Sequence, residues 1–242
     1  MAVTLKNQNA LIVGASSGIG HEIACLMSGE GARVVAAARR LDRLEKLRDE
    51  LAANGNQVHI VQADASKLDD MQRLGEEALS RLGQIDILVY AAGTNTPDRA
   101  MTRLTPQIWT SLLDVNLSGA YYITHAVLPG MRERKTGHLI YISSISGLLA
   151  DVSGAAYQAA KRGLVGFAHA IRVEEKENGI RTSVICPGLV DTELLEKRPV
   201  RPSAETLGKA MKPVDVAELA LAIAKMPARV VIPEVQILPT EL

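Results

Sequence analysis

The chain has 242 residues, 47% of them hydrophobic and 22% charged, a composition ordinary for one globular domain. Lysine and arginine balance aspartate and glutamate to a formal net charge of +0, which argues against nucleic acid or a membrane surface as the main partner. Two cysteines in apolar contexts, Cys25 and Cys186, argue against a disulfide framework. The N-terminal residues lack a signal-peptide pattern and no apolar run reaches membrane-spanning length, so we expect a cytoplasmic protein.

Runs rich in Val, Ile, Leu and Ala alternate with amphipathic stretches along the chain. The sequence predicts, in chain order, strand 10–13, helix 19–27, strand 34–38, helix 41–53, strand 58–63, helix 71–82, strand 85–90, helix 109–131, strand 138–143, helix 157–177, strand 181–186, helix 214–225 and strand 230–238. Such apolar strands are typical of a parallel sheet buried on both faces, with crossover helices between them. We therefore expect an α/β fold, a single doubly wound Rossmann-type domain over residues 1–242. Segment 191–212 is polar and shows no clear hydrophobic period, which is typical of lids and of disordered insertions.

The first predicted strand leads into a glycine-rich turn with Gly14, Gly18 and Gly20, which opens a helix. Glycines there let the backbone approach a pyrophosphate, and the helix N-terminus offers N–H groups to the anion. The same turn satisfies the nucleophile elbow of serine hydrolases, with Ser16 as the nucleophile. That elbow normally follows several strands, however, and no later Asp and His stand out as its partners. The five histidines show no ligand spacing, so we expect no metal.

The second predicted strand ends in Ala38, followed by Arg39 and Arg40. An NAD-binding protein usually has an acidic residue here for the ribose 2′-hydroxyl, whereas arginine pairs with a 2′-phosphate. The sequence therefore favours NADP(H), with Arg39 preferred over Arg40. The alternative is that both arginines only solvate a helix start, where a cation is mildly unfavourable.

A phenol and an ammonium, Tyr157 and Lys161, stand four residues apart and so share one helical face. A cation beside a phenol lowers its pKa, which suits proton exchange with a carbonyl or alcohol oxygen. Ser143 and Ser144 end the preceding strand, where ligands of open α/β sheets bind. Asn116 lies inside a long helix, where asparagine has modest propensity, and this invites a functional role.

These residues, in this order over nearly the whole chain, resemble the classical short-chain dehydrogenases/reductases. The resemblance implies Tyr157 as general acid/base, Ser144 as hydrogen-bond partner of the substrate oxygen, Lys161 on the nicotinamide ribose and Asn116 holding a water. The cofactor-binding residues that it implies, together with those inferred above, are Gly14, Ser16, Ser17, Gly18, Ile19, Gly20, Arg39, Arg40, Asp64, Ala65, Ala92, Gly93, Tyr157, Lys161, Pro187, Gly188, Val190 and Thr192. Asp64 is expected at the adenine, and the Val190 backbone with Thr192 at the carboxamide.

The resemblance further implies that 191–212 is the substrate lid and that the chain forms a homodimer or homotetramer through 109–131 and 157–177. The chain departs from the family pattern at Val13 and at 90–93, which affects cofactor affinity more than chemistry. The expected function is transfer of a hydride between NADP(H) and a small carbonyl or alcohol: an aldehyde, ketone, keto acid or 3-oxoacyl compound. Basic residues in the lid hint at an anionic substrate, although a solvated loop explains them as well. The alternatives are a non-catalytic dinucleotide-binding regulator and the Ser16 hydrolase.

Overall fold

The computed structural model describes residues 4–241 as a three-layer α/β domain around one parallel sheet. The sheet has seven strands in the order β3-β2-β1-β4-β5-β6-β7. The strands are β1 (Asn9–Val13), β2 (Arg33–Ala38), β3 (Val58–Gln62), β4 (Ile87–Tyr90), β5 (Gly137–Ile142), β6 (Ile180–Pro187) and β7 (Glu234–Ile237). The helices are α1 (Gly18–Gly29), α2 (Leu41–Ala53), α3 (Leu68–Leu82), α4 (Pro106–Leu113), α5 (Gly119–Arg134), α6 (Ala155–Glu174), α7 (Ala204–Lys209) and α8 (Pro213–Ala224). The doubly wound Rossmann-type prediction is confirmed.

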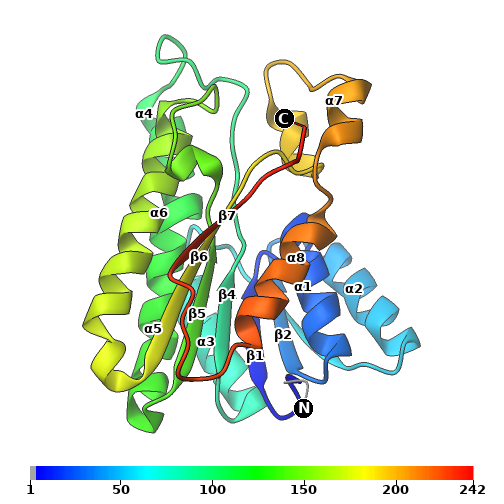
Figure 1. Ribbon diagram of the computed structural model, residues 1–242, viewed down its shortest axis with the longest axis vertical. Helices are drawn as coiled ribbons and strands as arrows, with labels where there is room; N and C mark the ends of the chain where they lie inside the picture. The colour runs from blue at the N-terminus through cyan, green and yellow to red at the C-terminus, as the bar shows by residue number, and fades with distance from the viewer. Residues whose placement is uncertain (1–3, 242) are drawn as a thin grey trace.

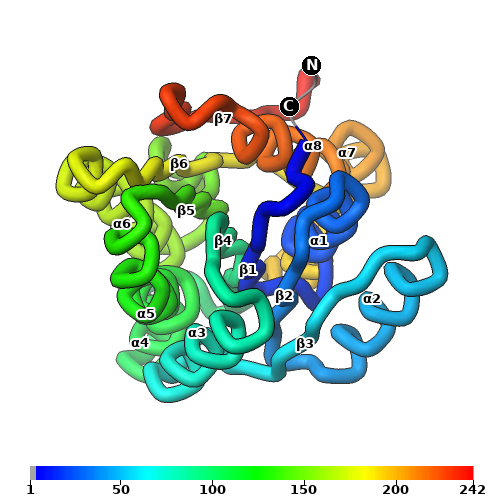
Figure 2. The backbone as a smooth tube through the Cα atoms, turned by 90° about the horizontal axis from the view of Figure 1, so that it is seen from below, coloured from blue at the N-terminus to red at the C-terminus, as the bar shows by residue number. Residues whose placement is uncertain are grey.

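Two helical layers cover the two faces of the sheet, as Figure 2 shows, with α1, α2 and α8 on one side and α3, α5 and α6 on the other. Side chains of β1 alternate between the two cores: Ala10 and Ile12 pack toward α1, and Leu11 and Val13 toward α3. This alternation on both faces explains why the strands are apolar without a polar period.

Strand order reverses between β1 and β4, which lie side by side at the centre of the sheet. After β1 the chain turns toward one face of the sheet, and after β4 it turns toward the other. A crevice therefore opens between the carboxyl ends of these two strands, and ligands of such folds bind there. In Figure 1 these ends point upward, toward the part of the chain that carries α7.

The predicted helix 109–131 is interrupted in the structure. It begins earlier, at Pro106, where Thr105 caps the helix by accepting a hydrogen bond from the Ile108 N–H at 3.2 Å. A π-helical turn over Asp114–Ser118 then joins α4 to α5. Such single π-turns are frequent at functional sites, and this one is centred on Asn116.

Three other predicted elements are shorter than expected, and one is the strand predicted over 85–90, which spans only Ile87–Tyr90. The helix predicted over 157–177 ends at Glu174, before a 3-10 turn over Lys176–Asn178 and Gly179 with a φ of +68°. The strand predicted over 230–238 pairs with β6 only over Glu234–Ile237, and Pro233 directly before it has no N–H for a ladder.

Segment 191–212 is not irregular throughout, because it contains a 3-10 turn (Glu193–Lys197) and α7. A parallel bridge between Val190 and Met211 closes its base, and Lys212 pairs with Asp191 at 2.9 Å. Among residues 4–241, none of the helices is long and apolar enough to cross a lipid bilayer.

Candidate active site

The predicted site residues gather around one cavity of about 400 Å3 at the carboxyl ends of the strands. Those that line it are Gly14, Ser16, Ser17, Gly18, Ile19, Gly20, Arg39, Arg40, Asp64, Ala65, Ala92, Gly93, Ser144, Tyr157, Lys161, Pro187, Gly188, Val190 and Thr192. Asn116, the remaining predicted residue, lies behind the cavity wall with no exposed surface.

The glycine-rich turn brings two loops of the crevice into backbone contact. Gly14 has a φ of +94°, which an L side chain rarely adopts, and a Cβ there would lie 2.5 Å from the backbone nitrogen of Ala92. At Gly20 the space that a side chain would take is filled by the backbone of Gly14. Only glycine therefore fits both positions, and the turn passes close under the cavity.

The start of α1 suits an anion. No side chain caps this helix at Ser17, and its first turn has no acidic residue. The first N–H groups of a helix need a partner, and its dipole favours negative charge there. Because Gly18, Ile19 and Gly20 line the cavity, these groups are offered to a ligand, and the residues present fit a pyrophosphate.

Two arginines follow β2 at the rim of the cavity and differ in their contacts. Arg40 donates from Nη2 to Ser17 Oγ at 2.6 Å and to Ser16 Oγ at 3.1 Å. The Nη1 atom of Arg39 lies 4.0 Å from Asp64 Oδ2. The sequence favoured Arg39, whereas in the structure Arg40 is the arginine bound to the glycine-rich turn, so both are candidates for a phosphate.

Glu193 of segment 191–212 holds Arg40 from the side opposite the serines. Its carboxylate accepts from Arg40 Nη1 at 2.8 Å and from Arg43 Nη1 at 3.0 Å. The hydrogen bond from Arg40, with the charges of both arginines, holds the pKa of Glu193 below its usual range. A carboxylate thus already occupies part of the guanidinium fork that could bind a phosphate.

Tyr157 lies in the first turn of α6 with 7% of its surface exposed, and Ser144 stands beside it in the cavity wall. Burial raises the pKa of the phenol to about 12, and hydrogen bonding with the Ser144 hydroxyl opposes this rise. The phenol is therefore protonated at neutral pH and can donate a proton to an oxygen in the cavity.

The sequence predicted that Lys161 lowers the pKa of Tyr157, and in this structure that prediction is wrong. Lys161 Nζ donates to the carbonyl oxygen of Ile142 at 3.0 Å and lies 5.8 Å from the centroid of the Tyr157 ring. The lysine is 3% exposed, and burial lowers its own pKa to about 8. Desolvation thus shifts the pKa of both groups in favour of their uncharged forms, an effect that spacing along a helix does not reveal.

The two adjacent serines have separate positions. Ser143 Oγ donates to the carbonyl oxygen of Lys161 at 3.0 Å, which ties β5 to α6. Ser144 Oγ instead donates to Ser146 Oγ at 3.2 Å, and Ser146 Oγ donates to Asp151 Oδ2 at 2.5 Å. The sequence reasoning did not find this hydroxyl chain, which positions the Ser144 side chain beside Tyr157.

Asn116 clamps the loop that follows β4. Its Oδ1 accepts from the Thr94 N–H at 3.1 Å, and its Nδ2 donates to the carbonyl oxygens of Thr94 and Leu112 at 2.9 and 2.8 Å. A Cβ built on Gly93 would lie 3.2 Å from Asn116 Oδ1 and 3.5 Å from Lys161 Nζ. The asparagine and the lysine therefore approach each other behind Gly93.

The predicted residues after β6 complete the opposite wall. The Val190 bridge to Met211 fixes the chain there, and Thr192 reaches over the turn, with its Cγ2 3.3 Å from where a Cβ on Gly18 would lie. After β3, Asp64 Oδ1 accepts hydrogen bonds from the Ser66 N–H at 3.0 Å and from the Ser66 hydroxyl at 2.8 Å.

Arg99 and Asp151 also line the cavity and were missed by the sequence reasoning. Both lie outside regular helices and strands, where periodicity gives no signal. Of the basic lid residues, Lys197 and Arg198 line the cavity and Arg201 does not.

The hydrolase alternative lacks a general base. Ser16 Oγ accepts from Arg40, and none of the five histidines lines the cavity. His138 is buried against Ser183 Oγ at 3.0 Å, and His169 contacts Glu234 at 3.0 Å. Activation of a serine needs a base within hydrogen-bond reach, which this cavity does not offer Ser16.

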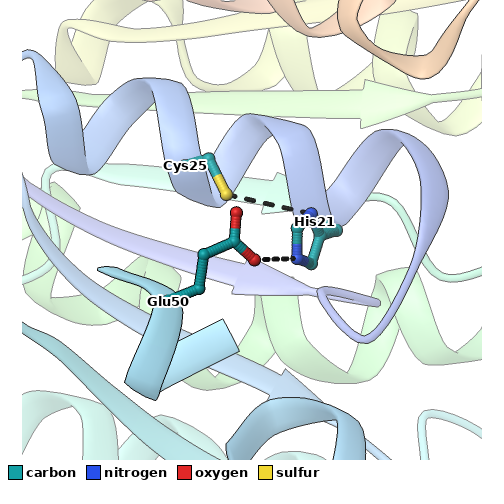
Figure 3. Close-up of side chains that lie close together, drawn as sticks. All are labelled: His21, Cys25 and Glu50. Atoms are coloured by element: carbon teal, nitrogen blue, oxygen red, sulfur yellow. Dashed lines mark hydrogen bonds and ion pairs between the residues drawn. The ribbon is translucent and has the colours of Figure 1, made fainter. Parts of the chain in front are cut away.

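One group of potential metal ligands lies away from the cavity. Figure 3 shows His21 and Cys25 one turn apart on α1, with Glu50 reaching across from α2. Cys25 Sγ lies 3.8 Å from Nδ1 of the ring and Glu50 Oε2 lies 3.5 Å from Nε2. The two neighbours face opposite ring nitrogens, whereas an ion binds one of them, so this geometry is that of a paired histidine. The prediction of no metal stays a prediction.

The sequence and the fold are similar to those of known proteins. A family model described as short chain dehydrogenase matches residues 8–202. The chain is 37% identical over 196 residues to an uncharacterized oxidoreductase of Listeria monocytogenes, and the match covers 80% of this chain and 79% of that protein.

Solved structures are similar over nearly the full length. A metagenomic short-chain oxidoreductase in complex with NADP has a TM-score of 0.85 at 31% identity, covering 98% of both chains. A variant of the actinorhodin polyketide ketoreductase with NADPH has a TM-score of 0.88 at 31% identity, covering 99% of this chain and 98% of that chain.

Proposed function

The chain belongs to the short-chain dehydrogenase/reductase family of oxidoreductases, and from this premise we propose that it reduces a small carbonyl substrate with NADPH. The substrate classes considered are aldehydes, ketones, keto acids and 3-oxoacyl compounds. The observation that carries the proposal is a protonated, buried phenol, Tyr157, in one cavity with Ser144, Lys161 and the glycine-rich turn.

The choice of NADP(H) rests on the charge at the end of β2. The uncapped start of α1 suits the pyrophosphate, and Arg39 and Arg40 supply guanidinium groups where a 2′-phosphate would lie. The similar solved structures named above contain NADP or NADPH, which supports the same choice.

The dinucleotide, when bound, supplies the hydride that adds to the carbonyl carbon. Tyr157 Oη donates its proton to the carbonyl oxygen, and the Ser144 hydroxyl hydrogen-bonds the same oxygen and orients it. Burial holds the phenol in its acid form in the free protein, and this is the form that donates a proton to a carbonyl oxygen. In the reverse direction, Tyr157 Oη would take the proton from the alcohol.

Lys161 and Asn116 support this chemistry from behind. In this proposal the Lys161 ammonium, which donates to the Ile142 carbonyl, binds the nicotinamide ribose and returns a proton toward Tyr157. Its pKa of about 8 lets it exchange that proton near neutral pH. Asn116 keeps the Thr94 loop and the π-turn in register beside this lysine.

The test is NADPH oxidation against a panel of aldehydes, ketones, keto acids and ketoacyl thioesters, with Tyr157→Phe as the inactive control. Turnover that disappears in Tyr157→Phe supports the proposal. Tight NADPH binding without turnover of any panel member favours the non-catalytic regulator. Labelling by an organophosphonate that is lost in Ser16→Ala would favour the hydrolase.

A further inference from the structure

The end of the cavity next to Tyr157 is cationic. Arg99, from the loop after β4, and Arg198, from the lid, both line the cavity, and both act on the pKa of Tyr157. The two segments also meet, because Arg99 Nη2 donates to the carbonyl oxygen of Lys197, the residue before Arg198. Two like charges from separate segments thus converge beside the proposed proton donor.

Arg99 is held rigidly without a carboxylate partner. Its side chain is only 9% exposed, with Nε donating to the Thr96 carbonyl at 3.0 Å and Nη2 to the Lys197 carbonyl at 2.8 Å. Within residues 4–241, neither Arg99 nor Arg198 forms an ion pair with a carboxylate, although a buried arginine such as Arg99 is seldom unpaired. A desolvated, preorganised cation such as Arg99 binds an anion strongly, and Arg198 is partly buried beside the same cavity.

Asp151 is the acidic residue near this end, and its carboxylate is already engaged. Oδ2 accepts from Ser146 Oγ at 2.5 Å, and Oδ1 accepts from the Ser153 N–H at 2.8 Å. Its charge offsets one of the two arginines at most, so the substrate end keeps a positive balance. By contrast, Arg103 on the same loop as Arg99 has Asp98 at 3.7 Å and lies outside this cavity.

We propose that Arg99 and Arg198 form a carboxylate subsite, so that the substrate is a short oxo acid whose carboxylate binds the two guanidinium groups while its carbonyl meets Ser144 and Tyr157. This inference rests on the proposed reductase function and narrows its substrate class. Planar guanidinium groups match a carboxylate through paired hydrogen bonds. Arg99, Arg198, Ser144 and Tyr157 all line the same cavity, so a carboxylate and a carbonyl of one substrate can meet them together.

The experiment compares short 2-oxo and 3-oxo acids with their methyl esters, which keep the carbonyl and remove the charge. We expect the wild-type protein to reduce the acids with kcat/KM at least about 10-fold above the esters, because charged hydrogen bonds are lost in the ester. Arg198→Gln should lower kcat/KM for the acids about 10- to 100-fold more than kcat/KM for the esters. Arg201→Gln, a lid arginine outside the cavity, is the matched control and should change neither.

The outcomes separate this inference from the function on which it rests. If esters and ketones are reduced as well as the acids and Tyr157→Phe is inactive, the carboxylate subsite is overturned and the reductase function is supported. Failure of every carbonyl compound counts against the reductase itself, and the subsite is then judged by calorimetry with the acids. Binding of an acid to the NADP+-loaded protein that is weakened in Arg198→Gln and Arg99→Gln supports the subsite, and no binding to the wild type overturns it.

Discussion

At Tyr157 burial raises the pKa of the phenol to about 12, and it outweighs the hydrogen bonding with Ser144 that lowers this pKa. The four-residue spacing to Lys161 did predict that the two side chains share a face. It could not reveal that the lysine turns to the Ile142 carbonyl and loses proton affinity by burial. Sequence patterns thus identify the residues of this site, while their protonation depends on three-dimensional desolvation.

The arginines after β2 carry the first residue-scale prediction. Arg40→Ala should weaken NADPH binding about 10- to 100-fold, because a charge-assisted pair with the 2′-phosphate is lost, and should leave NADH binding nearly unchanged. Arg39→Ala is expected to act in the same direction, and comparison of the two variants shows which arginine holds the phosphate. Dissociation constants from NADPH and NADH fluorescence measure both effects.

Arg48→Ala is the control, since this exposed arginine on α2 pairs with Asp49 away from the cavity. Equal weakening of NADPH and NADH in Arg39→Ala and Arg40→Ala would show that neither arginine recognises the phosphate.

The lid and α2 are joined, at the scale of elements, through Glu193 and the pair Arg40 and Arg43. This contact spans 153 residues of sequence between Arg40 and Glu193, so no local pattern could reveal it. The same holds for the π-turn around Asn116, because helical periodicity runs through it without a break. The order and type of the main strands and helices, in contrast, follow from their apolar periods.

Glu193→Gln should tighten NADPH binding about 2- to 5-fold, since an exposed ion pair of up to about 1 kcal/mol no longer competes with the phosphate for Arg40. NADH affinity should stay the same. Glu196→Gln, a change of the same kind in the same 3-10 turn, serves as the control. Weaker NADPH binding in Glu193→Gln would mean that this carboxylate positions Arg40 for the cofactor rather than competing with it.

For the whole molecule, the two cores on either side of the sheet account for the apolar strands that the sequence displayed. Both cysteines are free, as expected, with Cys186 buried and Cys25 partly buried. The cytoplasmic setting stays a prediction. The loop-borne residues Arg99 and Asp151 escaped prediction because their position depends on how distant segments meet above the sheet.

His138 links the stability of the whole fold to pH. It is buried in β5 with Nδ1 unpartnered among the described residues, and burial lowers its pKa to about 3. Below about pH 6.5, His138 therefore binds a proton in the unfolded chain but not in the folded chain. Stability should be full above this pH and fall as the pH drops toward 3.

Thermal unfolding between pH 7 and 4 tests this, with His138→Gln expected to show a shallower fall in Tm than the wild type. His125→Gln removes an exposed histidine and should keep the wild-type slope. An unchanged slope in His138→Gln would place the acid sensitivity elsewhere.

The predicted homodimer or homotetramer has a candidate surface on α5 and α6. Tyr121 and Val173 are exposed there, and the Tyr121 ring packs edge-on against Phe167 with centroids 6.3 Å apart. We expect light scattering to give two or four times the chain mass of 25.9 kDa, and Tyr121→Glu to shift the mass toward the monomer. Leu79→Glu, an exposed position on α3, is the control, and a monomeric wild type at high concentration would refute the prediction.

The central claim is that Tyr157 donates the proton in an NADPH-dependent reduction, and one variant tests it most directly. In Tyr157→Phe, the NADPH dissociation constant and kcat should be measured on the same preparation with the best substrate of the panel. We predict nearly unchanged NADPH affinity with kcat lowered about 100- to 10,000-fold, as expected for loss of a general acid. Turnover close to that of the wild type would contradict the account.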